Sequence, residues 1–579
     1  MHRRSDVWTG PRARRIVLGV LVLAAGPLLC REAAAAPTIT AVLDAAAYTP
    51  DIAQGSVFVV KGASLCGPGT VYGSIPLSQS PLNNVKITFT PAAGGASTDA
   101  YMVYTYAAGA LNQLAAILPS TVAPGDYNVT VTSSGAVSPA FKATVVAHKF
   151  GIITVNGSGA GRAVIQNYIS SSQYDLGRYT TGTIAGFTYS PAHPGQIIVI
   201  WGTGMGPISS PDNVVPGAID LRSSLDIRVT IDGKEYKPDL YAGRAPSLPG
   251  ADEIVMTLPA DVSTGCMLTM QVSVNGQLSN ESLLSIAPGA NAVCTEPGFS
   301  TEILTKLDQG GKFNVGALSL GGSLSTSTSR QGVTTKLRLD DAGAFFVSLN
   351  PDEITPASIG QTTAPLTSGC TVTRRILVQT TPGPVVIPQF SLLGPGQLRL
   401  TGPNVINAPI STVTLLTGNI SGVTASSGAV LAGGTYTVTG PGGKDVGPFT
   451  ATIQMAPPLI VTGGVGTEID RSQPLAITWT GGGTSQVTIA GGASVQLPGS
   501  VPGNRQFDSG TFQCITTADK GSFTVPASIL QQLPATSGNL TLTSNYNISN
   551  FNAPLVAGGN LDYGVFYTGF TNSFNPTYK

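Results

Sequence analysis

Apolar and polar residues alternate in short runs along much of this chain, and the runs end at glycine or proline. In the segment 127–132, Tyr-Asn-Val-Thr-Val-Thr, every second residue is apolar. A period of two places successive side chains on opposite faces, so this run predicts a strand with one buried face. The segments 398–403, 434–441 and 475–480 are similar and run into Gly-Pro or Gly-Gly turns. Many short strands joined by turns predict an all-β chain.

Two further patterns add local detail. Ile227–Ile231 and Lys234–Tyr236 flank Asp232-Gly233, a dipeptide that readily supplies the positive φ angles of a tight hairpin turn. One short helix is predicted over residues 527–532, stopped by Pro534.

A repeated block defines the first half of the chain. Residues 55–65 align without a gap with residues 195–205, 140 positions later. The same spacing persists to the end of each block, which indicates a duplicated β-module. The further matches are Leu118-Pro119 with Leu258-Pro259, Gly125 with Gly265, and Ala147 with Ala287.

The second copy carries the motifs of a family resemblance. Residues 194–207, which include Trp201-Gly-Thr-Gly-Met-Gly-Pro207, the pair Leu258-Pro259 and the segment 274–280 resemble a domain family repeated in acidobacterial-type secreted proteins. That family is similar to the IPT/TIG immunoglobulin-like domains. The resemblance covers about residues 40–297. It implies tandem immunoglobulin-like β-sandwiches and assigns no catalytic residue.

These patterns divide the chain into six parts, with further β-sandwich-type domains after the two modules. Beyond residue 297 the pattern of short strand-like runs and turns continues without a clear repeat of the modules. Pro457-Pro458 marks a boundary within this part. The predicted parts are a signal peptide at 1–36, immunoglobulin-like module 1 at 38–147, a β-rich bridge at 148–189, immunoglobulin-like module 2 at 190–297, and β-domains at 298–456 and 457–579.

The N-terminus has the three parts of an export signal. Five arginines between positions 3 and 15 precede an apolar run over residues 16–30, and alanines at 33–36 supply a cleavage site. The run is shorter than a membrane span, so we expect residues 1–36 to be removed and the protein to be secreted or periplasmic. No second apolar stretch approaches a membrane span.

The charge balance argues against a nucleic-acid partner. Charged residues make up 10% of the chain, and the residues after position 36 include 24 basic and 28 acidic side chains, a net charge of −4. Nucleic-acid binding requires clustered lysine and arginine. A content of 42% apolar residues is sufficient for sizeable cores despite 71 glycines and 42 prolines.

Five cysteines remain after residue 36, and an oxidising compartment favours their pairing. Cys266 begins a predicted strand of module 2 and Cys294 follows its last strand, so we predict a disulfide between them. Two separate buried thiols are the alternative. Cys370 and Cys514 form a second candidate pair, and the odd count leaves at least one thiol over. No Cys-x-x-Cys spacing indicates a zinc or redox site.

Residues that usually perform acid–base or metal chemistry are few. After residue 36 the histidines are His148 and His193, and no nucleophile motif lies beside them, so both are interpreted as surface or linker residues. Asp340-Asp341 and Asp352-Glu353 offer oxygen ligands for calcium, but their spacing matches no EF-hand, and they are interpreted as loop acids. Gly202–Gly206 lacks the following helix of a nucleotide site. We predict no cofactor, metal or catalytic residue.

Aromatic residues gather at the C-terminal end, among them Tyr563, Phe566, Tyr567 and Phe570. Exposed rings there would stack on sugars or present a strand to a partner. A final core strand whose rings fill a sandwich is the alternative.

The leading functional hypothesis is an exported, non-catalytic binding or scaffolding protein, acting in surface adhesion or extracellular matrix contact. Its partner would be a cell-surface or extracellular glycan or protein. The alternative is a polysaccharide-active enzyme, or a carbohydrate-binding accessory protein, with its binding face in the C-terminal half. A pair of catalytic carboxylates meets only in the fold, so sequence alone leaves both hypotheses open.

Overall fold

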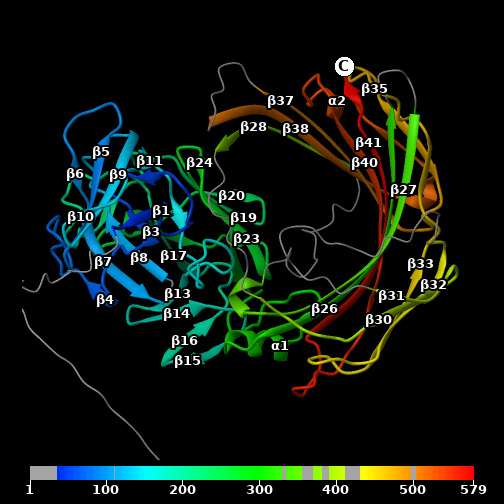
Figure 1. Cartoon of the computed structure of the whole chain (residues 1–579), viewed down its shortest axis with the longest axis horizontal. Coiled ribbons are helices and arrows are strands. Elements are labelled where there is room, and N and C mark those ends of the chain that lie inside the picture. The colour runs from blue at the N-terminus through cyan, green and yellow to red at the C-terminus, as the bar shows by residue number, and fades with distance from the viewer. Residues whose placement is uncertain are drawn as a thin grey trace, which may run out of the picture.

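The computed structural model describes residues 36–109, 111–328, 334–354, 369–380, 390–410, 431–496 and 504–579. Strands dominate these ranges, and Figure 1 shows two sandwiches on one side of the molecule and a long curved sheet on the other. The helical elements described are short: α1 (Thr301–Asp308), α2 (Ala527–Leu530), η1 (Pro351–Glu353) and η3 (Ala518–Lys520). Residues 1–35 of the predicted export signal lie outside the described residues.

Module 1 is a sandwich of two sheets. The sheet that we call the front sheet has the strand order β1 (Thr38–Asp44), β3 (Val57–Ala63), β8 (Leu111–Ile117), β7 (Tyr101–Ala108) and β4 (Gly69–Tyr72). The second sheet has the order β2 (Ile52–Ala53), β11 (Phe141–Val146), β9 (Gly125–Ser133), β5 (Val85–Pro91) and β6 (Thr98–Asp99), and β10 (Ala136–Val137) pairs with β9.

Alternation along the strands builds the core of module 1. On β5, Val85, Ile87 and Phe89 are fully buried, whereas the residues between them are partly exposed. Phe89 meets Phe58 of the front sheet edge to face, with ring centroids 5.3 Å apart. The period-two pattern therefore places one face of each sheet in a shared core, as in an immunoglobulin-like sandwich.

Module 2 is a second sandwich. One sheet has the order β15 (Gly182–Ile184), β16 (Phe187–Ser190), β14 (Gln173–Gly177), β13 (Ile165–Ser170), β17 (Ile197–Thr203), β22 (Asp252–Thr257), β21 (Tyr241–Arg244) and β18 (Ile219–Asp220), and β12 (Gly151–Ile152) also pairs with β17. The other has the order β20 (Lys234–Tyr236), β19 (Ile227–Ile231), β23 (Gly265–Val274) and β24 (Gln277–Leu278), and β25 (Ser282–Ile286) pairs with β23. The segment 148–189, predicted as a bridge, thus supplies strands to the first of these sheets.

The sequence repeat reappears in the backbone hydrogen bonds. The N–H of Gly55 donates to the carbonyl of Leu118 at 2.9 Å. The N–H of Gly195 donates to the carbonyl of Leu258 at 2.7 Å, with both partners shifted by 140 positions. The repeated glycine therefore marks the same turn in both modules.

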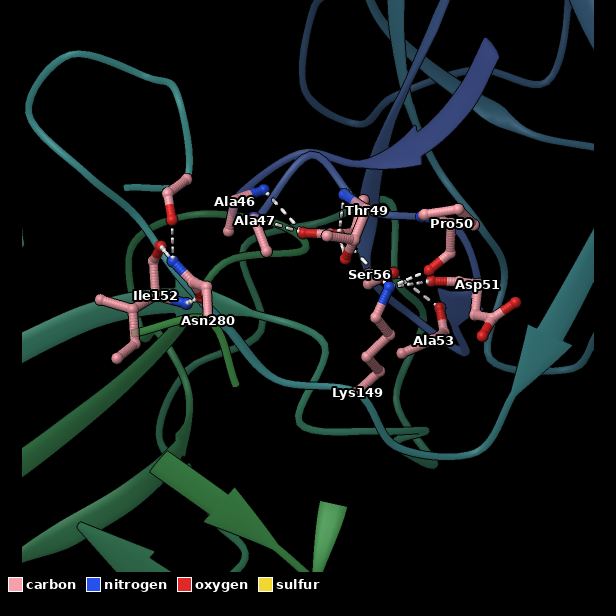
Figure 2. A network of polar contacts seen from close by, with 12 residues as sticks. Ala46, Ala47, Thr49, Pro50, Asp51, Ala53, Ser56, Lys149, Ile152 and Asn280 are labelled. Carbon is pink, nitrogen blue, oxygen red and sulfur yellow. Dashed lines mark hydrogen bonds and ion pairs between the residues drawn. The ribbon is translucent and has the colours of Figure 1, made fainter. Parts of the chain in front are cut away.

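A half-buried lysine joins the two modules. Lys149 donates from Nζ to the carbonyl oxygens of Pro50 and Asp51, and its Nζ lies 3.5 Å from the carboxylate of Asp44 (Figure 2). Burial lowers the pKa of Lys149, and the charge of Asp44 counteracts part of that shift. Because these partners come from module 1 and Lys149 leads into module 2, the cluster holds the junction together.

The two repeated glycines differ in their surroundings. Gly55 has φ +69°, and a Cβ there would lie 2.5 Å from the guanidinium of Arg244 in module 2. Arg244 is 1% exposed and is fixed by Asp252 and by the carbonyl of Gly206, each at 2.7 Å. Gly195 has φ +80° but faces open space. Module 1 therefore uses its copy of the turn as a contact with module 2.

The C-terminal half is organised by one eight-stranded sheet, which we call the long sheet. It crosses the boundary predicted near Pro457-Pro458, because residues 298–456 and 457–579 each supply four of its strands. The two predicted domains therefore share a sheet. Its order is β28 (Gly369–Thr380), β38 (Asn504–Thr517), β37 (Gln486–Gln496), β40 (Gly538–Asn550), β41 (Tyr563–Phe574), β26 (Phe313–Thr328), β27 (Thr334–Leu349) and β29 (Phe390–Leu392).

Smaller sheets pack on the long sheet and complete sandwich-type cores. One covers β26, β27 and β41, with the order β31 (Val405–Ile410), β30 (Leu398–Gly402), β32 (Gly434–Gly440) and β33 (Phe449–Met455). Another covers β37, β38 and β40, with the order β34 (Ile460–Gly463), β36 (Leu475–Thr480) and β39 (Ser522–Val525). The strands β35 (Glu468–Ile469) and β42 (Thr577–Tyr578) form a two-stranded sheet.

A separate apolar cluster lies between module 2 and the long sheet. It combines Tyr179 and Cys266 of module 2 with Leu307 of α1 and Phe313 of β26. The disulfide between Cys266 and Cys294 lies in this cluster, and it is the pair that the sequence predicts. A second disulfide joins Cys370 and Cys514 across β28 and β38. Cys66 is the free cysteine among the described residues.

A buried ion pair crosses the same boundary. Arg162 is 3% exposed and donates to the carboxylate of Asp308 at 2.9 Å and to that of Asp352 at 2.5 Å. Asp308, fully buried at the end of α1, also accepts the backbone N–H and hydroxyl of Thr180, at 2.7 and 2.8 Å. Its charge is therefore compensated by donors from module 2.

The two glycines predict unequal effects of the same substitution. Gly195→Ala should lower the free energy of unfolding by about 1–2 kcal/mol, because alanine is strained at positive φ. Gly55→Ala should cost about 3 kcal/mol or more, because the added methyl also presses on the fixed Arg244. Calorimetric unfolding of both variants measures the difference, and equal losses would contradict the contact between the modules.

Replacing Cys266 and Cys294 together by alanine should lower the free energy of unfolding by about 3 kcal/mol, because the disulfide closes a loop with a sequence separation of 28 residues. Urea unfolding measures this loss, and Cys66→Ala is the control that leaves both disulfides in place. Non-reducing peptide mapping should recover Cys266 joined to Cys294, and alkylation of both as free thiols would contradict the pairing.

Asp308→Asn should lower the free energy of unfolding by about 3–5 kcal/mol, because the buried Arg162 loses one of its two carboxylate partners. The amide NH2 of asparagine would also face N–H and O–H groups that themselves donate hydrogen bonds. The matched control is Asp220→Asn, which weakens the surface pair with Arg222 and should change stability little. Similar melting temperatures for the two variants would show that Asp308 does not hold the boundary.

Candidate functional site

The structure corrects part of the C-terminal aromatic hypothesis. Phe566 is fully buried in the core between β41 and the sheet β31-β30-β32-β33, and Phe570 is 1% exposed. The guanidinium of Arg338 lies over the ring of Phe570, 5.2 Å from its centroid. Neither ring is available to a sugar. Alternation along β41 is the reason, because both positions fall on the inward face.

The other two predicted aromatics do not form a row either. Tyr563 is half-buried and stacks on Phe299, with centroids 6.5 Å apart, and burial raises its pKa. Tyr567 is also half-buried, and its cross-strand neighbour on β26 is Ser319. The sugar-stacking surface predicted at the C-terminal end is therefore absent from this strand.

The candidate acid–base and metal residues are engaged in structural contacts. Asp340 accepts from Arg338 at 3.0 Å, and Asp352 accepts from Arg162. The Nδ1 atom of His148 lies 2.8 Å from the carbonyl of Met205, and that of His193 lies 3.0 Å from its neighbour's carbonyl. Among the described residues, His, Cys, Asp and Glu nowhere form a group of three that could hold a metal.

A different surface has the features of a binding site: the outer face of the front sheet in module 1. The inward side chains of its strands, among them Phe58, Met102 and Leu114, fill the sandwich core. An irregularity in the β7–β8 register between Met102 and Tyr104 reverses the faces of β7, so that Thr105 is buried and Tyr104 and Tyr106 point outward. β4 is the edge strand beside β7, and Figure 1 places both on the side of the molecule away from the long sheet.

Strand register assembles these side chains into two adjacent rows. Tyr72 of β4 lies opposite Tyr104, and their rings meet edge to face at 6.2 Å with 65° between the planes. The next row runs across four strands in the order Thr70, Tyr106, Gln113 and Lys61. Segments that are distant in the sequence thus share one surface.

The two rows form a cleft of about 600 Å³, which we call the tyrosine cleft. Its volume lies in the range of small-ligand sites. Two of its side chains are strongly exposed, Tyr72 at 72% and Leu111 at 66%. The lining residues are Thr40, Lys61, Gly62, Thr70, Tyr72, Tyr104, Tyr106, Leu111, Asn112 and Gln113.

Hydrogen bonding orients the less exposed ring of the cleft. Gln113 donates from Nε2 to the hydroxyl of Tyr104 at 2.5 Å. Burial raises the pKa of Tyr104, and this hydrogen bond offsets part of the shift. Tyr104 also packs on the small apolar cluster of Leu43, Val59 and Ala115 on the same face. Tyr104 is therefore fixed, while Tyr72 projects from the edge strand.

The lining groups define what the cleft can do chemically. Rings, hydroxyls and amides can stack on the apolar face of a sugar and hydrogen-bond its hydroxyls. The lining residues include no aspartate or glutamate, and glycoside hydrolysis usually needs two carboxylates. The arrangement therefore suits binding and lacks the carboxylate pair that usually performs glycoside hydrolysis.

Sequence reasoning missed this site although a signal was present. Tyr104 and Tyr106 alternate with smaller residues, which predicts a strand with two rings on one face. The cross-strand partners Tyr72 and Gln113 lie far along the chain or across a turn, and only the register brings them beside those rings.

Two smaller hollows lie on the C-terminal half. One of about 410 Å³ lies over β30, β32 and β33 beside Arg399 and Phe449. Another, of about 280 Å³, is mostly apolar and lies beside Asp341 and Ile406. Neither combines exposed rings with amides as the tyrosine cleft does.

In the described part of the chain, no helix has the length and apolar character needed to cross a membrane.

Comparisons with known proteins show no family. No family model matches the chain, and no curated protein matches it significantly. Among solved structures, it is similar to a Bacteroides ovatus mixed-linkage glucan utilization locus protein, SGBP-B, in complex with a mixed-linkage heptasaccharide, at 13% identity and a TM-score of 0.18. The match covers 51% of this chain and 64% of that one.

Two other similar structures come from chicken CNTN1 and from a bacterial adhesin. The FN1–FN3 domains of chicken CNTN1 match at 8% identity and a TM-score of 0.12, covering 93% of this chain and 99% of that one. A 1.5-MDa bacterial ice-binding adhesin matches at 13% identity and a TM-score of 0.11, covering 66% and 91%. At such low TM-scores, none of these likenesses bears on the ligand.

Proposed function

We propose that this protein is an exported, non-catalytic carbohydrate-binding protein and that the tyrosine cleft of module 1 is its binding site. The observation that carries the proposal is the exposed Tyr72 ring beside Tyr104 and Tyr106, in a cleft that also presents Gln113 and Asn112. Rings supply apolar contact area, and the amides supply both donors and acceptors for sugar hydroxyls.

The ring geometry favours a single glycan chain over a flat crystalline surface. Tyr72 and Tyr104 are inclined at 65° to each other, so the two rings cannot both lie flat on one plane. A single glycan chain that enters the cleft can place one sugar against the Tyr72 ring and the next sugar against the Tyr104 ring. The volume of about 600 Å³ suits such a short segment.

Export and attachment complete the proposal. Two disulfides are typical of proteins from an oxidising compartment, and the arginine-rich apolar N-terminus directs the chain to the periplasm or the exterior. Tandem modules on a long sheet would carry the cleft away from the rest of the molecule. Adhesion to a glycan-bearing surface or matrix is the role that we infer, and the family resemblance of module 2 to repeated secreted domains agrees with it.

Alanine at both Tyr72 and Tyr104 should weaken glycan binding at least tenfold, since exposed aromatic anchors dominate binding energy. The protein without residues 1–36 is first screened against a panel of plant and bacterial polysaccharides. Titration calorimetry then compares it with the double variant on each polymer retained. We expect the variant to remain folded with a modestly lower melting temperature, because Tyr104 packs on the apolar cluster of the front sheet.

The matched control is Tyr174→Ala. Tyr174 is 45% exposed on module 2 and meets Tyr168 edge to face at 5.5 Å, so it resembles Tyr72 but lies outside the cleft. Its removal should leave affinity unchanged. Equal losses from the control and the cleft variant, retention of no polysaccharide by the wild type, or release of hydrolysis products would overturn the proposal.

A further inference from the structure

Lys61 distinguishes the tyrosine cleft from a site for neutral sugars. It is the one charged residue among those that line the cleft, and it is half-buried. Its ammonium lies 4.5 Å from the centroid of the Tyr48 ring. Among the described residues, no carboxylate lies within ion-pair distance of Lys61. A half-buried cation therefore faces the cleft without an anion.

The other half-buried lysines of the described chain all have an acidic partner. Lys86 lies 2.9 Å from Asp99, Lys149 lies 3.5 Å from Asp44, and Lys306 lies 2.7 Å from Asp562. Burying part of an ammonium costs hydration, which an opposite charge compensates. Burial lowers the pKa of Lys61, with no acidic neighbour to oppose the shift. Lys61 is the exception to a pattern that this protein otherwise follows.

Lys61 lies close enough to the tyrosine rings for one ligand to contact both. Tyr106, Gln113 and Lys61 are cross-strand neighbours on β7, β8 and β3. Adjacent strands lie about 4.8 Å apart, so Tyr106 and Lys61 are separated by about 10 Å at the backbone. A short sugar segment stacked on the tyrosines would therefore reach the ammonium with a substituent.

We propose that the tyrosine cleft takes a glycan whose sugars carry an anionic substituent, a carboxylate or a sulfate, and that Lys61 pairs with that group. The inference rests on the proposed function and specifies its ligand class. The rings hold the sugar, and Lys61 selects for charge, because a neutral glycan leaves the ammonium without a counter-ion.

The test uses pairs of polymers that share one sugar backbone and differ in charge. The chain without residues 1–36 is titrated with polygalacturonate and its methyl ester, alginate and its propylene glycol ester, and dextran sulfate and dextran. At least one anionic polymer should bind at least about tenfold tighter than its neutral partner, as expected for one charge-assisted contact. The first two pairs test carboxylate and the third tests sulfate.

Variants at Lys61 assign the preference to this side chain. Lys61→Met keeps the stem and removes the charge, so it should abolish the preference and lower binding of the anionic polymer to the level of its neutral partner. Lys61→Arg should retain the preference. The control is Lys142→Met, an exposed lysine on β11 of the opposite sheet, which should change neither affinity. Melting temperatures confirm that each variant is folded.

The outcomes separate this inference from the proposed function. If neutral and anionic polymers bind equally, or if Lys61→Met and Lys142→Met reduce binding alike, the charge selection is wrong. In that case a loss of binding in the Tyr72 and Tyr104 double variant still supports a carbohydrate site. If the tyrosine variant also binds as the wild type does, both proposals fail.

Discussion

The buried pair of Arg162 and Asp308 is the interaction on which the assembly of the two halves depends. Asp308 is fully buried at the end of α1, where every donor to its carboxylate that the structure describes comes from module 2. A buried charge is tolerated only when its partners are in place, so the pair enforces one arrangement of module 2 against the long sheet. The apolar cluster around the Cys266–Cys294 disulfide then closes the same boundary.

Buried cations elsewhere in the described structure are also paired with oxygen acceptors, and Lys61 in the tyrosine cleft differs from them. At the junction of the modules, Lys149 is surrounded by carbonyl oxygens and Asp44, and within module 2 Arg244 is held by Asp252. These buried cations serve structure. Lys61 differs because its described neighbours are a ring and polar uncharged groups, and it faces a cleft open to solvent. A sheet with one face in the core and the other free presents that cleft without disturbing the fold.

Sequence patterns predicted the framework well where one strand or one repeat decides the outcome. The shared spacing of Gly55 and Gly195 predicted two equivalent turns, and the backbone hydrogen bonds are equivalent. Predictions that needed knowledge of a neighbouring strand fared differently. The ring of Phe566 is buried because a second sheet covers β41, and the boundary near Pro457-Pro458 is crossed because β26 pairs with β41 from the far end of the chain.

By itself, the sequence determined that this protein is built from strands, that its first half is duplicated, and that acid–base and metal chemistry is poorly represented. Those properties follow from alternation, turn residues and composition, which act locally. Only the tertiary structure decided which aromatic residues are buried and which form a surface. Side-chain alternation says that a strand has two faces, but non-local pairing determines which face is covered. The tyrosine cleft exists because β4, β7, β8 and β3 are neighbours in space, and their order in the sequence does not show it.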